Sequence, residues 1–393
     1  MCSDCRGNME AKKTVEVDIA VVGGGVAGCT AAMFLSQSSY SVALLDKLPM
    51  PVIRIGECLP PASRRILRRL NLLDGLEALI QGTGEKAHLT SYGTQSYWGN
   101  DRLQVTDALR NPDGFGWHLD RQAFELYLRE TVRQRGAVCL WGTKLLKSHY
   151  ENSRWQITAR TTNENAEQKD YKIAARFVID ASGRQSNFAR QLGIGRTHFD
   201  KLIACWATLP DNDSNKMSTI VATIQGWWYS APLPGNKRII AFQTDSDLMD
   251  QQPIKDAGQF IELARQCPAM TKFLDNGIGE ITFHGITAAN STRLNQVSGQ
   301  QWAALGDAVM SFDPLSSQGM FNAMAGALQL SQLIDSSGII AEINKEKMEQ
   351  LAHTYNQQMD QIWEYYLKHK FIFYSQEQRW KQAVFWKRRL EQN

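Results

Sequence analysis

Near its start the chain reads Asp18-Ile-Ala-Val-Val-Gly-Gly-Gly-Val-Ala-Gly28. Ile19 to Val22 form a short, continuous apolar run, which is typical of a strand buried on both faces of a sheet. Gly23, Gly25 and Gly28 follow with the spacing GxGxxG, and the apolar residues after them indicate a helix. The start of such a helix offers free backbone N–H groups to the phosphates of a ligand. The stretch therefore predicts a dinucleotide-binding turn.

Each glycine in this turn has its own physical reason. Gly23 permits the tight turn, Gly25 lets the backbone approach a pyrophosphate, and Gly28 lets the helix pack closely against the strand. A second apolar run ends at Asp46, eighteen residues after Gly28, where a carboxylate can accept hydrogen bonds from a ribose. The alternative is a glycine-rich turn without a ligand. The order of strand, helix and acid favours a dinucleotide, but it does not separate NAD from FAD.

The composition limits the class of protein. A chain of 393 residues can bury the cores of two domains. Lys and Arg number 43 against 40 Asp and Glu, and they are mostly spread along the chain, so we expect no nucleic-acid partner. No apolar run reaches membrane-spanning length and none follows basic residues as in a signal peptide, so we expect no membrane partner.

The cysteines indicate the compartment. Seven cysteines, an odd number, are scattered through the chain, which is typical of a reducing compartment, and we expect a cytoplasmic protein. Cys2 and Cys5 form a CxxC pair, which is compatible with half a zinc site or a redox pair. Because no second thiol pair exists, we interpret this region as a disordered leader and expect no metal site.

Two further segments repeat the pattern of a buried strand that ends in glycine and acid. Residues 176–183 contain Asp180 and Gly183, and residues 302–307 end in Gly306 and Asp307. The carboxyl ends of parallel strands meet at one edge of a sheet, where ligands bind. A nicotinamide site needs only the first turn, whereas an extended FAD needs contacts along its whole length. The three strand ends therefore favour FAD.

Other segments complete the expected organisation. Residues 201–244 read as antiparallel strands with Pro and Gly turns, among them Met217–Trp228, and His88–Trp98 reads as one strand. A long helix is expected from Gly319 to Ile334, and residues 345–393 read as helical and rich in aromatic side chains. A helix over Ala62–Leu70 carries arginines on one face, which indicates either a solvated surface or a site for an acidic partner.

Together these motifs resemble the FAD-dependent monooxygenases of the p-hydroxybenzoate hydroxylase fold, and within them the tryptophan-halogenase branch. The matching segments run from residue 18 to about residue 325. They are Gly23–Gly28 with Asp46, Gly56-Glu57-x-x-Pro60, Arg121 in Leu-Asp-Arg-x-x-Phe, Asp180-x-x-Gly183, Gly306-Asp307 and Pro314-x-x-x-Gln318-Gly319-Met320.

The resemblance implies an α/β fold. A Rossmann-like FAD-binding domain carries an inserted antiparallel-sheet substrate domain, the α+β part, and a helical C-terminus. We expect the FAD-binding domain at residues 16–85, 105–195 and 300–340, and the substrate domain at 86–104 and 196–299. Residues 1–15 are expected to be a flexible leader, and 341–393 the helical, aromatic-rich C-terminal region.

FAD is the implied cofactor. The resemblance places Asp46 on the adenosine ribose, Arg121 near the pyrophosphate and Asp307 on the ribityl chain. The start of the helix at Gly319 would face negative charge on a reduced flavin. The full expected set of cofactor-binding residues is Gly23, Gly25, Val26, Ala27, Gly28, Asp46, Lys47, Arg54, Glu57, Arg121, Asp180, Gly183, Gly306, Asp307, Pro314, Gln318, Gly319 and Met320.

Several departures from the halogenase pattern favour hydroxylation. Halogenases of this branch carry W-x-W-x-I-P, but here Tyr229 and Ala231 replace the second Trp and the Ile. Their catalytic lysine is missing from His88–Trp98, and Ser316 stands where they have a glutamate. A halogenase needs a cation to steer hypohalous acid away from the flavin, whereas hydroxylation needs a substrate held near a flavin hydroperoxide.

A narrower group is similar in its C-terminal pattern. Glu377-Gln-Arg-Trp380 followed by Phe385-Trp-Lys-Arg-Arg389, with Gly56-Glu-Cys-Leu-Pro-Pro61, resembles the flavoproteins that mature cysteine tryptophylquinone enzymes such as lysine ε-oxidase and glycine oxidase. The resemblance implies hydroxylation of a tryptophan in a quinoprotein precursor. Molecular oxygen and either NAD(P)H or a flavin reductase would be the co-reactants. The alternatives are an aromatic halogenase and an FAD-containing maturation partner without chemistry of its own.

The sequence does not decide the catalytic base. Glu57, His88 and His118 are candidates because they lie in or near segments expected beside the flavin. A lone histidine is more often a structural residue than a catalytic one. The C-terminal aromatics are likewise open to two interpretations, helix packing onto the FAD-binding domain or a docking surface for a partner protein.

Overall fold

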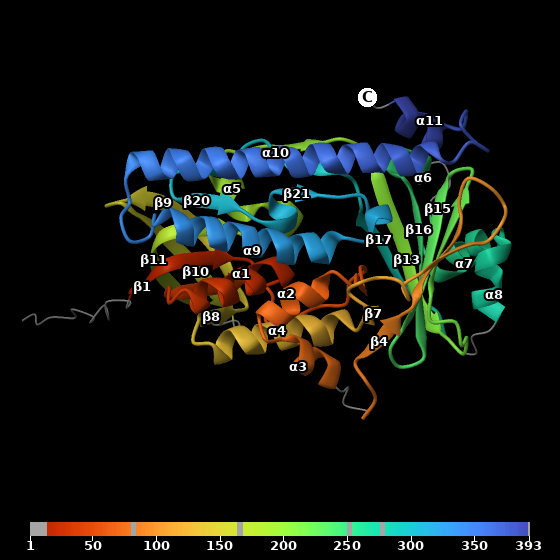
Figure 1. Ribbon diagram of the computed structural model, residues 1–393, viewed down its shortest axis with the longest axis horizontal. Helices are drawn as coiled ribbons and strands as arrows, with labels where there is room; N and C mark the ends of the chain where they lie inside the picture. Colours follow the sequence, from red (N-terminus) through yellow and green to blue (C-terminus); the bar gives the residue numbers. More distant parts are fainter. Residues whose placement is uncertain (1–13, 80–83, 163–167, 250–253, 276–279, 392–393) are drawn as a thin grey trace, which may run out of the picture.

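Two sheets organise the molecule (Figure 1). The computed structural model describes residues 14–79, 84–162, 168–249, 254–275 and 280–391. Cys2 and Cys5 therefore lie outside the described residues. The first strand, β1 (Thr14–Val22), already begins at Thr14, so the last two residues of the expected leader belong to the sheet.

The first sheet has eight strands, and its centre is parallel. Its main order is β19-β20-β11-β1-β2-β8, with β10 paired to β11 and β9 paired to β10. The other bounds are β2 (Val42–Asp46), β8 (Val138–Trp141), β9 (Thr143–Glu151), β10 (Arg154–Thr162), β11 (Gln168–Asp180), β19 (Ser298–Gly299) and β20 (Trp302–Ala304).

The register of this sheet brings the predicted strand ends together. Val22 of β1 lies opposite Asp180 of β11 and Leu45 of β2, and Asp180 lies opposite Ala304 of β20. The turns after β1, β11 and β20 therefore leave the same edge side by side, as the three strand endings predict. Each strand is buried on both faces in this region, which explains its continuous apolar sequence.

Helices cover the first sheet. Helix α1 (Val26–Gln37) packs against α9 (Gly319–Ser337), and α10 (Lys345–Ser375) runs along the outside of α9 (Figure 1). The remaining helical segments are α2 (Ser63–Arg69), α3 (Leu73–Ala78), α4 (Arg121–Gln134), η1 (Gly183–Gln185), α5 (Asn187–Gln191), η2 (Gly306–Ala308) and η3 (Pro314–Ser316). In α2, Ile66 and Leu67 are buried, while Arg65, Arg68 and Arg69 are exposed, as its pattern predicts.

The second sheet has seven strands in the order β17-β13-β16-β15-β14-β5-β6. Trp227 and Trp228 of β15 point to opposite faces, because neighbouring residues alternate along a strand. Trp228 packs against Phe260 on the face covered by α7 (Ala257–Arg265) and α8 (Pro268–Asp275), and Trp227 lies on the face towards the first sheet. The other bounds are β5 (Gly93–Tyr97), β6 (Gln104–Asp107), β13 (Leu202–Pro210), β14 (Ser218–Thr223), β15 (Gly226–Leu233), β16 (Lys237–Asp245), β17 (Thr282–Ala288) and α6 (Ser246–Met249).

Two strand predictions are wrong in detail. The expected strand His88–Trp98 is two strands, β4 (His88–Ser91) and β5, in different sheets. Gly93 makes this break with a positive φ of 146°, and a Cβ there would lie 2.2 Å from the Thr106 carbonyl oxygen. The expected strand Met217–Trp228 is likewise divided between β14 and β15, which pair as a hairpin.

Two small sheets connect these parts. One contains β3 (Cys58–Leu59), β7 (Gly116–Leu119) and β4, and the other contains β12 (Arg196–His198), β18 (Thr292–Leu294) and β21 (Met310–Ser311). Because β4 and β5 are separated only by Tyr92, the first small sheet is joined closely to the seven-stranded sheet.

The C-terminal region spans both sheets. Tyr355, Trp363 and Tyr366 of α10 pack with the core of the first sheet. Tyr374, near the end of α10, packs with Trp386 of α11 (Val384–Glu391) on the inner face of the second sheet. The buried aromatic residues are therefore used for packing, as one interpretation predicts, but onto both parts of the molecule, whereas Tyr365, Phe371 and Phe373 are exposed. The region is also not helical throughout, because residues 376–383 separate the two helices.

A buried ion pair fixes α10 to the rest of the chain. The Lys370 ammonium donates to the Asp200 carboxylate at 2.6 Å and to the Ser291 hydroxyl at 2.9 Å. We expect Lys370→Met to lower the free energy of unfolding by about 3 kcal/mol, because it leaves a buried carboxylate without its cation. The loss is at the low end for such pairs because the Leu202 amide still donates to Asp200.

Chemical denaturation measures this effect. Lys345→Met is the matched control, because Lys345 lies on the same helix with 89% of its side chain exposed. This control should change the free energy of unfolding by less than about 1 kcal/mol. Equal losses in the two variants would contradict a stabilising role for the buried pair.

Candidate functional site

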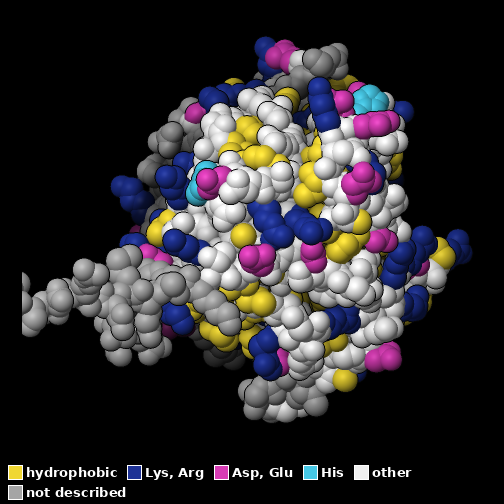
Figure 2. Space-filling view, turned by 90° about the vertical axis from the view of Figure 1, so that its left-hand side faces the viewer, with side chains coloured by type: hydrophobic (Ala, Val, Ile, Leu, Met, Phe, Trp, Pro, Cys, Tyr) yellow, Lys and Arg dark blue, Asp and Glu magenta, His cyan; other side chains and the backbone are white. Residues whose placement is uncertain are grey.

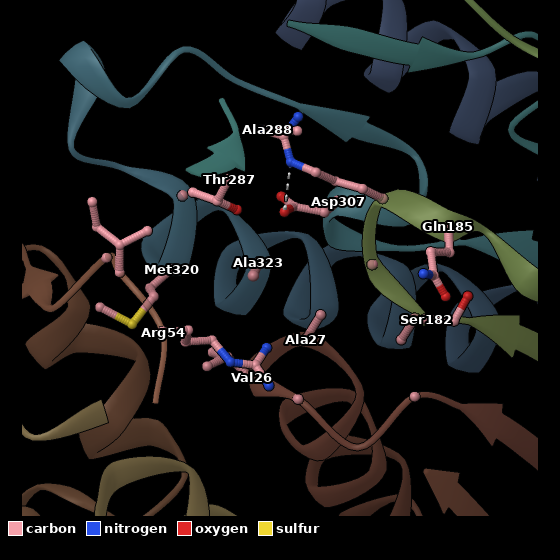
Figure 3. A pocket seen from close by; sticks show the side chains of 18 of the residues that line it. Val26, Ala27, Arg54, Ser182, Gln185, Thr287, Ala288, Asp307, Met320 and Ala323 are labelled. Atoms are coloured by element: carbon pink, nitrogen blue, oxygen red, sulfur yellow. Dashed lines mark ion pairs between the residues drawn. The ribbon is translucent and has the colours of Figure 1, made fainter. Parts of the chain in front are cut away.

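A large cavity lies between the two sheets. It has a volume of about 1240 Å³, above the roughly 300–1,000 Å³ usual for small-molecule pockets. One end is lined by the turns that follow β1, β2 and β11, and the other by residues of the second sheet such as Trp227 and Tyr229. Figure 3 shows Val26 and Ala27 on one wall, with Asp307, Thr287 and Ala288 across the space. The volume suits an extended ligand with room for a second molecule at the sheet end.

The three glycines of the first turn differ as their expected roles require. Gly23 has a φ of 113°, and a Cβ there would lie 2.2 Å from the Ala181 carbonyl oxygen. A Cβ at Gly28 would lie 1.9 Å from the Gly23 carbonyl oxygen, so Gly28 permits close helix packing. Gly25 lines the cavity, and a Cβ there would meet nothing within 4 Å. A ligand can thus reach the backbone at Gly25, where α1 begins without a side-chain cap.

Asp46 lines the cavity beside this turn. Its Oδ2 accepts a hydrogen bond from the Gly24 amide at 2.6 Å, and its Oδ1 accepts one from the Leu48 amide at 2.7 Å. The Arg129 guanidinium lies 3.4 Å from Oδ1 and also donates to the Gly24 carbonyl at 3.1 Å. A carboxylate has about four acceptor positions, so Asp46 retains capacity for a ribose.

Arg129 also lines the cavity, and the sequence interpretation missed it. The spacing of charged residues along α4 could have revealed it. Arg121, Glu125 and Arg129 are four residues apart on α4 and therefore share one helix face. Arg121 donates to Glu125 at 2.6 Å and to the Gly56 carbonyl, and Arg54 lies 3.7 Å from the other Glu125 oxygen.

Several cationic side chains lie along the cavity wall near the glycine turn. Arg54, Arg121 and Arg129 all line the cavity, and Lys47 lines it while donating to Gln185 at 3.0 Å. An anionic ligand at this end would be favoured electrostatically. The arrangement fits a pyrophosphate, with the open backbone at Gly25 as the second element of the site.

Three of the expected cofactor residues lie behind the cavity wall. Gly28, Asp180 and Gly306 do not line the cavity. The Asp180 carboxylate accepts from the Phe188 and Ala189 amides, each at 3.0 Å, and burial raises its pKa. It therefore orders the turn that carries Gly183. A Cβ at Gly306 would lie 2.9 Å from the Ala27 Cβ, so Gly306 lets the end of β20 approach α1.

The remaining expected residues line the middle of the cavity. Gly183, Asp307, Pro314, Gln318, Gly319 and Met320 all do so. Asp307 lies 3.9 Å from the Arg184 guanidinium, the ion pair drawn in Figure 3. Helix α9 begins at Gly319 without a side-chain cap, so its positive end is directed at this space.

A carboxylate and a phenol meet at the sheet end. The Tyr229 hydroxyl donates to Glu57 Oε1, and the Gly56 amide donates to Oε2 at 3.2 Å. Both side chains line the cavity and are buried, Glu57 with 3% exposure. Burial, together with the neighbouring Glu57, raises the pKa of Tyr229 well above its usual value. The phenol therefore stays protonated and serves as a hydrogen-bond donor.

Asp313 is a second carboxylate at this end that the sequence interpretation did not select. Its Oδ2 accepts from the Tyr374 hydroxyl at 2.8 Å, and that hydroxyl accepts from the Trp227 indole N–H at 3.1 Å. The Asp313 amide donates to the Tyr366 hydroxyl at 3.0 Å. Burial raises the pKa of Asp313. Its place directly before Pro314 in a matched motif was the only sequence signal.

The candidate histidines lie away from the cavity. Neither His88 nor His118 lines it, so of the three candidate bases only Glu57 does. Burial lowers the pKa of each histidine to about 4, and the charge of Arg238 further lowers that of His118. Both imidazoles are therefore neutral near pH 7. The His88 Nδ1 accepts from the Asp120 amide at 3.2 Å, a structural role.

The buried His118 predicts an acid-sensitive fold. Its pKa is about 4 in the folded protein and about 6.5 in an unfolded chain, so between these values the unfolded chain binds the additional proton. Stability should fall as the pH falls through this window, by at most about 1.4 kcal/mol per pH unit for one histidine. In His118→Gln the free energy of unfolding should depend less steeply on pH. Urea unfolding at pH 7 and pH 5 measures it, and an unchanged slope would contradict the assignment.

In the part of the chain that the structure describes, no group of three or more His, Cys, Asp or Glu side chains is arranged to hold a metal ion. Nor do the helices within the described ranges include one that is long and apolar enough to cross a membrane. On the face shown in Figure 2, basic and acidic side chains are intermixed.

Comparison with known proteins adds independent findings. The FAD binding domain family matches residues 16–369. A Marinomonas mediterranea protein named LodB, described as an FAD-dependent oxidoreductase, is 29% identical over 378 residues, covering 95% of this chain and 96% of its own.

Two solved structures share the fold. The myxobacterial chondrochloren halogenase CndH is 21% identical with a TM-score of 0.83, covering 95% of this chain and 86% of its own. The peptidyl tryptophan dihydroxylase QhpG, described as essential for tryptophylquinone cofactor biogenesis, is 19% identical with a TM-score of 0.73, covering 95% and 79%.

Proposed function

Because the chain belongs to the FAD binding domain family and is an FAD-dependent oxidoreductase, we propose that it hydroxylates a tryptophan side chain in a precursor protein. The modified tryptophan would become part of a tryptophylquinone cofactor. FAD is the cofactor of the family, and when bound it supplies the activation of molecular oxygen. The electrons would come from NAD(P)H or from a flavin reductase.

Different residues along the cavity would bind different parts of FAD. We propose that the backbone at Gly25, with Arg54 and Arg121, holds the pyrophosphate, and that Asp46 holds the adenosine ribose. Asp307 would hold the ribityl chain. The positive end of α9 at Gly319 would stabilise negative charge on the flavin.

One observation carries the hydroxylase proposal. The sheet end of the cavity is lined by Trp227, Tyr229 and Phe312, together with the carboxylates Glu57 and Asp313. The described lysines that line the cavity are Lys47 and Lys144, and both belong to the end formed by the first sheet. The end formed by the second sheet therefore offers carboxylates rather than an ammonium group. Aromatic walls suit an indole ring, and a carboxylate suits proton removal.

The Glu57–Tyr229 pair would act on the proton. When a hydroxyl group is placed on the indole ring, a C–O bond forms and a C–H bond breaks, and the released proton needs an acceptor. Glu57 can take it on Oε2, while the Tyr229 hydroxyl keeps its hydrogen bond to Oε1. The second atom of the oxygen molecule leaves as water, and the two electrons come from the reductant.

LodB, described as an FAD-dependent oxidoreductase, matches this chain over nearly the whole length of both proteins, which supports the class of reaction. One similarity supports the choice of substrate. QhpG, which acts on a peptidyl tryptophan, shares the fold over 95% of this chain. The halogenase CndH has the same fold, so halogenation remains an outcome for the test to separate.

Product mass spectrometry tests the proposal. The purified FAD-loaded protein is given a reductant, oxygen, bromide and the precursor of a tryptophylquinone enzyme. We expect one or two oxygen atoms on a tryptophan and none on the same precursor with that tryptophan replaced by phenylalanine. A brominated product would establish the halogenase instead. Tight binding of the precursor without modification would establish a maturation partner without its own chemistry.

A further inference from the structure

We infer that the outer edge of strand β17 binds an extended segment of the precursor protein as an added β-strand. The segment would present its tryptophan side chain to the adjoining cavity. This inference rests on the proposed function, because it concerns how a protein substrate reaches the same site.

Strand β17 lies at one end of the seven-stranded sheet. Its described strand partner is β13, and in the sheet order nothing follows β17 on its other side. An edge of this kind presents backbone N–H and C=O groups to the surroundings, and an extended peptide can pair with them. The strand lies at the surface, since a Cβ at Gly285 would meet no described atom beyond the adjoining chain within 4 Å and the Ile286 side chain is half exposed.

The end of β17 forms part of the cavity rim. Thr287 and Ala288 are consecutive, so their side chains point to opposite faces of the sheet, yet both residues line the cavity. This is possible where the strand presents its edge to the space. Figure 3 shows Thr287 and Ala288 across the cavity from Val26 and Ala27. A peptide paired with this edge would lie directly beside the cavity.

The sequence of β17 leaves this edge unprotected. It reads Thr282-Phe-His-Gly-Ile-Thr-Ala288, without the charged residues or proline that commonly block edge pairing. A bulge against β13 occurs between Trp206 and Ala207, but Gly285 to Ala288 pair regularly with β13. The opposite edge strand, β6, ends at Asp107 and does not line the cavity. The β17 edge is therefore the one suited to substrate.

Apolar side chains beside the same cavity indicate the chemistry of the partner. Val52 lines the cavity, and the neighbouring Met50 and Ile53 expose 56% and 59% of their surface. Ile286 of β17 exposes 50% on the other face of the sheet, where its cross-strand partner Cys205 packs. Exposed apolar groups of this size on both sides of one strand edge favour burial by a protein chain. The occupant would be an uncharged, extended segment with apolar side chains flanking its tryptophan.

Backbone-blocked peptides test the inference. The probe is a seven-residue peptide of alternating Thr and Val with a central Trp, blocked at both ends and labelled for fluorescence anisotropy with the FAD-loaded protein. In an extended peptide, alternate backbone amides point to opposite edges. Two further probes are N-methylated, one on the amides of one edge and the other on the amides of the opposite edge. We expect one methylated probe to bind about tenfold more weakly and the other to bind as the parent does, because an added strand pairs through one edge.

A matched pair of variants locates the binding surface. Ile286→Lys places a charge beside the β17 edge and should weaken the parent peptide about tenfold. Ile224→Lys is the control, because Ile224 is 55% exposed but lies in the turn between β14 and β15, which β13 and β16 separate from β17. This variant should bind the peptide as the unmodified protein does. Both variants should retain the flavin absorbance spectrum.

The outcomes separate this inference from the proposed function. Equal binding of both methylated probes, no binding of the parent peptide, or equal effects of the two lysine variants would overturn strand addition. Hydroxylation of a precursor that is insensitive to Ile286→Lys would also overturn it while the proposed function stands. Edge-dependent binding without any oxygen transfer would support strand addition while the proposed function fails.

Discussion

Gly25→Val is expected to reduce FAD affinity about a thousandfold while leaving the fold intact. Gly25 lines the cavity, and among the described residues a Cβ there would have no atom within 4 Å other than those of the adjoining chain. The new side chain would occupy the space through which a pyrophosphate approaches the start of α1. Losing two hydrogen bonds to a charged group costs about 4 kcal/mol, which corresponds to about a thousandfold in affinity.

The control for this prediction is Gly28→Val. Gly28 lies three residues further on but behind the cavity wall, and its Cβ would lie 1.9 Å from the Gly23 carbonyl oxygen. This variant should therefore lose thermal stability even without cofactor, whereas Gly25→Val should melt as the cofactor-free parent protein does. Calorimetric titration with FAD and thermal melts of the cofactor-free proteins measure both effects. An FAD affinity of Gly25→Val within tenfold of the parent would contradict the assigned approach of the pyrophosphate.

Glu57→Gln is expected to bind FAD and peptide but to lose at least about a hundredfold in the rate of tryptophan hydroxylation. A positioned proton acceptor contributes about 10² to 10⁴ in rate. Glutamine preserves the size of the side chain, and its oxygen can still accept from the Tyr229 hydroxyl. Its amide nitrogen can neither accept from the Gly56 amide nor take up the proton as a carboxylate does. The flavin spectrum and the peptide affinity should therefore stay near those of the parent.

Single-turnover kinetics with mass spectrometry measures this rate. Glu342→Gln is the matched control, because Glu342 is exposed and does not line the cavity. It should hydroxylate at the parent rate. Asp313→Asn provides a comparison within the cavity. Asp313 is engaged by Tyr374 and the Leu315 amide, so this variant should act mainly through the position of the turn. A rate for Glu57→Gln within threefold of the parent would exclude Glu57 as the proton acceptor.

The parts of the site that could be predicted from the sequence are those encoded locally. The glycine turn, the acid at the end of β2 and the glycine–acid endings of β11 and β20 each occupy a few consecutive residues. Parallel pairing then brings these endings to one edge of the sheet. Their number and order favoured FAD over a nicotinamide cofactor, and the resemblance to FAD-dependent monooxygenases implied FAD.

The parts that were missed depend on residues distant in sequence. Tyr229 was selected as a departure from the halogenase pattern, but its partner Glu57 lies 172 residues away. Asp313 owes its environment to Tyr366 and Tyr374, which lie 53 and 61 residues later. The hydrophobic periodicity of a sequence does not indicate which distant residues pair in this way. The break of the expected His88–Trp98 strand at Gly93 has the same cause, since it depends on the approach of Thr106.

The C-terminal helix has a consequence for the order in which the enzyme is made. Tyr366 and Tyr374 hold the turn at Asp313, and Tyr374 also holds Trp227 of the second sheet. A ribosome-bound chain that has not yet produced α10 contains both sheets but lacks these contacts. Since folding proceeds during synthesis from the N-terminal side, the cavity acquires these wall contacts only after α10 has been made. Flavin capture would accordingly wait for the synthesis of a helix that belongs to neither sheet.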